Sequence, residues 1–142
     1  MNGKFARIAG WVMSGLVIAF MLLDGALKLV PLDVVIKSTA ELGFPPSVEL
    51  IRGIGLVAIL CAALYAFPPT AMLGAILLTA YMGGTVATHL RIGNPLFTHI
   101  LFGPYLAILT WGGLYLRDPR IRALVPWREG NPPTPTTPVD PR

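Results

Sequence analysis

The chain has 142 residues, of which 54% are hydrophobic and 13% are charged, and its formal net charge is +4. This balance is too apolar for a soluble domain of that length, whose surface must face water. It predicts a single-domain integral membrane protein, because four crossings of about 20 residues each leave no room for a separate soluble catalytic domain.

Four apolar segments have the length of membrane-spanning helices, at residues 8–30, 48–67, 71–90 and 96–116. Only FPPT joins the second to the third, and only RIGNP joins the third to the fourth. Connections that short make neighbouring helices antiparallel. We therefore predict an all-α, antiparallel four-helix bundle within residues 1–128.

The segments outside the spans have their own signatures. The middle of PLDVVIKSTAELGFPPS, between the first two spans, can form a short helix that Pro45 and Pro46 end. Gly103 and Pro104 predict a kink in the fourth span. Arginines mix with apolar residues over 117–129, as in an interfacial segment. The proline-rich residues 129–142 predict a disordered tail.

The basic residues predict the orientation. Seven of the eleven lie on the side of the two termini, at Lys4, Arg7, Arg117, Arg120, Arg122, Arg128 and Arg142. By the positive-inside rule, both termini are then cytoplasmic, in a bacterial cytoplasmic (inner) membrane, and the 31–47 and RIGNP loops are outside. A signal peptide is the alternative for residues 1–27, but no small-residue cleavage site ends that run. No soluble aromatic platform accompanies the arginines, so no nucleic-acid partner is expected.

Ionisable residues gather at the outer ends of all four predicted spans. The candidate ligand-binding cluster comprises Asp24, Lys28, Glu49, Arg52, His89, Arg91 and His99. Charges at bilayer depth cost about 2.5 to 3.5 kcal/mol each, so their presence indicates a function. The inner halves of the spans are expected to carry no such group.

A plain structural explanation of these charges also exists. Asp24 with Lys28 is an i,i+4 pair and Glu49 with Arg52 an i,i+3 pair, so each pair can neutralise itself on its own helix. The long basic side chains can also snorkel to the headgroups. Asp24 has a short side chain and is the member expected to face the bundle interior.

The remaining reactive residues predict little chemistry. Cys61 is alone, which excludes an intrachain disulfide or a redox pair. His89 and His99 match no metal-ligand spacing, so we expect hydrogen bonds between helices or to a ligand head group, and no metal site. Small residues around Gly83 and Gly84 predict close packing within the bundle, with a homodimer contact as the alternative.

Four stretches carry a family resemblance: DGALKL at 24–29, ELGFP at 41–45, LGAILLTAYMGGTVATHLRIGNPLF at 73–97 and LYLRDPRIRALVPWR at 114–128. Together they resemble the DoxX-like family of small bacterial four-helix membrane proteins. The resemblance implies an association with membrane quinone oxidoreductases, including a thiosulfate:quinone type, and with oxidative-stress complexes. It also implies an acidic residue in the second span and a basic one in the turn after it, where this chain has Ala58 and Pro69.

Three functional hypotheses follow. In the first, the chain is an accessory subunit whose outer cluster binds a quinone or another lipid-like head group, while a membrane or periplasmic redox partner transfers the electrons. In the second, it is a membrane enzyme in which Asp24 or Glu49 transfers a proton. In the third, it is a non-catalytic scaffold or assembly factor. The sequence contains no dinucleotide fingerprint and no cysteine pair, so no covalently bound cofactor is expected. No residue is assigned a catalytic role. These observations favour the first hypothesis, the accessory subunit.

Overall fold

A computed structural model describes residues 3–30 and 32–124 of the chain. Its elements are α1 (Gly3–Leu29), α2 (Asp33–Glu41), α3 (Val48–Ala66), the 3-10 turn η1 (Pro68–Thr70), α4 (Ala71–Arg91), the π-helical turn η2 (Leu96–Ile100), α5 (Phe102–Arg117) and α6 (Pro119–Leu124). The expected tail at 129–142, and the end of the interfacial segment, lie outside the described residues.

Four helical stretches are long and apolar enough to cross a membrane. They are Gly3–Leu29, Val48–Ala66, Pro68–Arg91 and Leu96–Arg117, and no strand occurs in the described ranges. The prediction of four helices long and apolar enough to span a membrane is thus confirmed, and α1 begins five residues before the predicted first span. The short helix expected in the first loop is α2, and it ends before Pro45 and Pro46.

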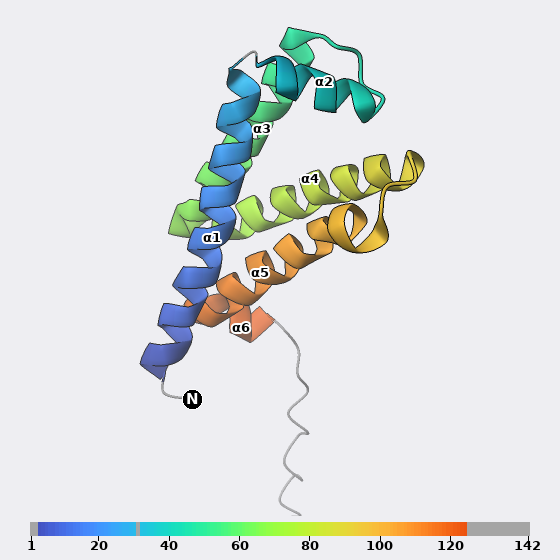
Figure 1. Ribbon diagram of the computed structural model, residues 1–142. Helices are drawn as coiled ribbons and strands as arrows, with labels where there is room; N and C mark the ends of the chain where they lie inside the picture. Colours follow the sequence, from blue (N-terminus) through green and yellow to red (C-terminus); the bar gives the residue numbers. More distant parts are fainter. Residues whose placement is uncertain (1–2, 31, 125–142) are drawn as a thin grey trace, which may run out of the picture.

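The four long helices form two pairs that diverge. α1 packs against α3, α4 packs against α5, and the pairs meet where α1 touches α5 and α3 touches α4. Within each pair the helices run in opposite directions, but α4 and α5 leave α1 and α3 at a wide angle (Figure 1). The short helix α2 crosses from the end of α1 toward the free end of α4. The architecture is therefore a wedge, closed at one end and open at the α2 end.

Glycines determine where the helices approach closely. A Cβ atom on Gly25 of α1 would lie 2.8 Å from the carbonyl oxygen of Gly55 on α3, near the α2 end. A Cβ atom on Gly10 would lie 2.8 Å from the carbonyl oxygen of Gly113 on α5, near the closed end. Small residues allow such backbone contact in membrane bundles. The α1–α3 pair is thus tight toward the open end, whereas the close approach of α1 to α5 lies near the base.

A buried polar network joins three helices at the closed end. The hydroxyl of Tyr65 donates to the carbonyl oxygen of Thr110 at 2.7 Å and lies 2.9 Å from Oγ of Ser14. Arg117 is only 8% exposed, with its guanidinium 4.5 Å from the ring of Trp11 and 4.7 Å from that of Tyr65. The predicted last span ends just before Arg117; in the structure Arg117 is the last residue of α5 and lies buried inside this base.

The fourth span is broken one turn before its proline. Pro104 has no backbone N–H, so it cannot donate to the carbonyl of Ile100, and it lies in the first turn of α5, where a helix tolerates proline. The chain takes up the irregularity in η2, where the N–H of Leu101 donates to the carbonyl oxygen of Leu96 at 2.8 Å, five residues back. The kink predicted from Gly103 and Pro104 appears as this π-helical turn, which also carries His99.

Arginines bind carbonyl oxygens at the ends of helices. The last turn of a helix leaves carbonyls without intrahelical donors, and a cation there also interacts favourably with the helix dipole. Four pairs of this kind are Arg52 with Leu29, Arg91 with Leu42, Arg117 with Tyr65 and Arg122 with Leu116. Each arginine lies on a different element from the one it caps, so these bonds tie the elements together.

Candidate functional site

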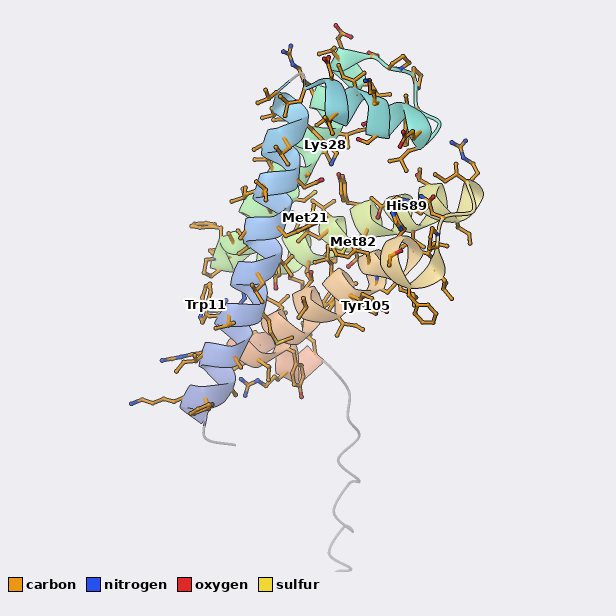
Figure 2. All side chains as sticks on the ribbon, viewed as in Figure 1. Trp11, Met21, Lys28, Met82, His89 and Tyr105 are labelled. Carbon is orange, nitrogen blue, oxygen red and sulfur yellow. The ribbon has the colours of Figure 1, made fainter. Side chains whose placement is uncertain are left out.

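A cavity of about 740 Å³ fills the open end of the wedge. Its lining comes from α1, α2, α3, α4, η2 and α5, together with Leu42 and Phe44 after α2, and most of the lining side chains are apolar. The buried Met21 and Met82 line its deep part, whereas Lys28 and His89 lie nearer the open end (Figure 2). The volume is that of a small-molecule site with a few polar groups on an apolar wall.

An ion pair with a tyrosine beside it forms one polar wall. Lys28 and Asp24, one turn apart on α1, form a salt bridge, and their side chains are only 21% and 30% exposed. The hydroxyl of Tyr81, on α4, lies 3.4 Å from the other carboxylate oxygen of Asp24. The contact therefore crosses the wedge and joins the two helix pairs. One N–H of Lys28 is used by Asp24, which leaves the ammonium group two further donors.

Two histidines form the second polar group. The rings of His89 on α4 and His99 on η2 meet edge to face with centroids 5.5 Å apart, and both line the cavity. The side-chain amide nitrogen of Asn94 lies 2.7 Å from Nδ1 of His89. Because an amide nitrogen only donates, Nδ1 accepts, and neutral His89 carries its proton on Nε2. The imidazole thus retains one donor for a ligand.

The hydroxyls on the cavity wall are engaged by their own helices. Thr39 donates to the carbonyl oxygen of Val35, Thr85 to that of Met82, and Thr88 to that of Gly84. What they offer a ligand is oxygen lone pairs. The donors available for a ligand are therefore those of Lys28 and the histidines, and they suit a head group that accepts hydrogen bonds.

The structure brings four of the seven candidate residues together, and three lie elsewhere. Asp24, Lys28, His89 and His99 line the cavity, whereas Glu49, Arg52 and Arg91 do not. The expected Glu49–Arg52 pair does not form: Glu49 accepts from the N-cap Ser47 at 2.8 Å, and Arg52 donates to the end of α1. Among the described residues, only Lys28 and Asp24 make a salt bridge.

Sequence reasoning missed the residues that complete the site. Tyr81 was not among the candidates, because its contact with Asp24 depends on how two helices cross. Gly83 and Gly84 were expected to pack inside the bundle, but a Cβ atom on either would have no neighbour within 4 Å. That packing interpretation is wrong for both, since Gly84 lines the cavity and Gly83 is exposed.

Metal ligation has no support in the described residues, where no group of three histidine, cysteine or carboxylate side chains could hold an ion. Cys61 is buried in the core and does not line the cavity. Ala58, at the place where the resemblance implied an acid, is fully buried in the same core. The chemistry that the site offers is therefore hydrogen bonding and charge, on an otherwise apolar wall.

Comparison with known proteins gives one match. The model of the DoxX-like family matches residues 12–113, which include the second and third helical stretches entirely, the first from Val12 and the last up to Gly113. Neither the curated proteins nor the solved structures include a match to the chain. The matched region contains the residues that line the cavity and, at the base, Ser14, Tyr65 and Thr110 but not Trp11 or Arg117; the chain belongs to the DoxX-like family.

Proposed function

We propose that the chain is a membrane-embedded binding subunit whose cavity holds the acceptor head group of a lipid-like molecule, with a quinone as the first candidate. The observation that supports this proposal is the cavity itself, which is largely apolar yet bordered by Lys28, His89 and His99. A quinone carbonyl accepts one or two hydrogen bonds and carries no charge. Its ring suits an apolar wall, and its chain suits a site within a bilayer.

The proposal assigns the chain an accessory role, which the polar groups of the cavity support. They provide donors and an ion pair, and the electron transfer falls to a separate membrane or periplasmic redox partner. A second copy of the chain is a further partner that the proposal allows. A second candidate, proton transfer by Asp24, has one specific observation in its favour, the contact of its carboxylate with Tyr81 inside the cavity. Glu49 loses that role because it lies outside the cavity.

The proposal is tested by the molecules that copurify with the protein in mild detergent, identified by mass spectrometry. Wild type should retain a quinone above the level of bulk lipid. His89→Ala and Asp24→Asn should lower that retention at near-normal expression. Glu49→Gln is the matched control, since it changes a charge at the same end but outside the cavity. If all four proteins retain only phospholipid, and in equal amounts, the binding proposal is refuted and a scaffold role is favoured.

The proposed orientation has both termini in the cytoplasm of a bacterial cell and the cavity at the periplasmic end. Lys37 on α2 and Lys4 on α1 are both exposed and lie at opposite ends of the bundle. In a Cys61→Ala background, Lys37→Cys should react with an impermeant thiol reagent added to cells with a permeable outer membrane, and Lys4→Cys should not. Labelling of Lys4→Cys and not of Lys37→Cys would show that the orientation is the reverse of the one proposed.

A further inference from the structure

The end of the cavity between the end of α1 and the free end of α4 is covered by α2. Val35, Thr39 and Leu42 turn toward the cavity, and Thr39 is 6% exposed. Nη2 of Arg91, at the end of α4, donates to the carbonyl oxygen of Leu42 at 3.3 Å and ties this cover across the wedge. Gly43 has φ of +82°, and a Cβ atom there would lie 2.6 Å from the same Nη2 atom. Glycine therefore serves both the turn and the contact.

The side of the wedge between α1 and α5 is closed differently. Near the base the two backbones meet at glycines, and at Phe20 and Phe102 two aromatic rings meet across the two helices. The ring centroids are 5.1 Å apart, edge to face. Both rings line the cavity, and the two residues are 37% and 41% exposed on the outer surface. The pair is therefore the wall between the cavity and the surroundings of two membrane-spanning helices.

The two barriers differ in what their opening requires. A phenylalanine ring has no hydrogen bond to break, and a change of rotamer is enough to displace it. Lifting α2 instead breaks the bond between Arg91 and Leu42 and uncovers Thr39 and Val35. The barrier toward the bilayer is thus the weaker one.

We propose that the cavity communicates with the bilayer through a slit between α1 and α5, gated by Phe20 and Phe102. A molecule dissolved in the membrane enters head first past the rings, and its apolar chain then lies in the slit. The inference rests on the proposed function, and it narrows the ligand class to membrane-dissolved molecules with a slender apolar chain. A water-soluble ligand with the same head group does not reach the site.

The test measures whether lipid or water reaches the cavity when the whole chain is reconstituted in phosphatidylcholine vesicles. A bimane fluorophore is attached at Thr85→Cys, on the cavity wall, in a Cys61→Ala background. The same label at Ala87→Cys, an exposed α4 position outside the cavity, is the control. Doxyl-labelled phosphatidylcholine quenches from the lipid and iodide quenches from water.

We expect the label at position 85 to be quenched by the doxyl lipid more strongly than by iodide. Phe20→Ala should raise the doxyl quenching severalfold and leave the iodide quenching unchanged. Arg91→Ala should raise only the iodide quenching, because it releases the cover. The control label at position 87 should respond to neither substitution, which shows that the fold is retained.

Two outcomes would overturn the slit. Iodide quenching above doxyl quenching in the wild type would mean that the cavity opens to water. Ile54 lies on the α3 wall of the cavity. If Ile54→Ala raises the doxyl quenching and Phe20→Ala does not, the opening lies between α3 and α4. The experiment uses no quinone, so gating by Phe20 can be established even if the retention assay finds no ligand. If the protein retains a quinone but Phe20→Ala leaves the doxyl quenching at position 85 unchanged, the slit is refuted and the proposed binding function is not.

Discussion

The base of the wedge makes a quantitative prediction for Tyr65→Phe. Tyr65 is fully buried, and its hydroxyl joins α3 to α1 and α5 through Ser14 and Thr110. Since this hydroxyl donates to the Thr110 carbonyl, the proton in the other contact belongs to Ser14. Removing one oxygen atom therefore deletes two interhelical hydrogen bonds and leaves the packing of the ring unchanged.

The magnitude follows from what the two partners do next. The Thr110 carbonyl can keep the bond of its own helix, and the Ser14 hydroxyl can turn to a carbonyl one turn back on α1. Hydrogen bonds between membrane helices average about 0.6 kcal/mol and reach about 1.7 kcal/mol. We therefore expect Tyr65→Phe to lower the free energy of unfolding by about 1 to 2 kcal/mol. Ser14→Ala should cost less, because it removes one bond.

The assay is reversible unfolding by SDS in mixed micelles, followed by circular dichroism. Adding Ser14→Ala to Tyr65→Phe should cost less than the sum of the single changes, since both remove the same bond. Tyr105→Phe is the matched control, because Tyr105 on α5 is 47% exposed and its loss of a hydroxyl should leave stability unchanged. Unchanged stability in Tyr65→Phe, or strict additivity in the double mutant, would refute the role given to this network.

Three further changes follow from the same geometry. Gly113→Ala should destabilise the fold by about 1 to 3 kcal/mol, because its Cβ would lie 2.6 Å from a buried hydroxyl oxygen. In the same SDS titration, Gly83→Ala should be neutral or slightly stabilising, because its Cβ would meet open space. Asp24→Leu should lower the folded yield more than Asp24→Leu with Lys28→Leu, because the single change leaves a part-buried cation unpaired; equal yields would show that the pair is too well hydrated to matter. Pro104→Ala restores a backbone donor, so the helical circular dichroism signal should rise while ligand retention falls, as the histidine before it changes its place in the helix.

Hydropathy predicted the spans well because crossing a bilayer constrains length and composition directly. Hydropathy does not predict how the helices are placed relative to one another. Where two helices approach most closely depends on which glycines face each other, as Gly10 and Gly113 do, and periodicity does not show that. The sequence therefore predicted four helices and their neighbours along the chain, but not the wedge or the cavity inside it.

The candidate site was predicted in part, for a related reason. The i,i+4 spacing of Asp24 and Lys28 makes their pairing a local property, and the structure forms it. Arg52 has its carbonyl partner 23 residues away and Arg91 has its partner 49 residues away, so a local rule could not assign them. Tyr81 was missed because its partner Asp24 is 57 residues distant. Residues whose role is set by a crossing of helices need the fold before they can be assigned.

The two ends of the bundle use their polar groups in opposite ways, and this separates stability from binding. At the base, the hydroxyl of Tyr65 makes two contacts within the protein, and Arg117 is held by a carbonyl oxygen and two aromatic rings. At the open end, Lys28 and His89 keep donors that the protein does not use, beside a largely apolar cavity wall. Donors kept free beside an apolar cavity recur where function requires them, whereas the one buried side-chain atom without a partner among the described residues, Nη1 of Arg117, lies at the base. Substitutions at the base should therefore cost stability with ligand retention intact in the folded fraction, whereas His89→Ala should cost retention and leave stability unchanged or higher.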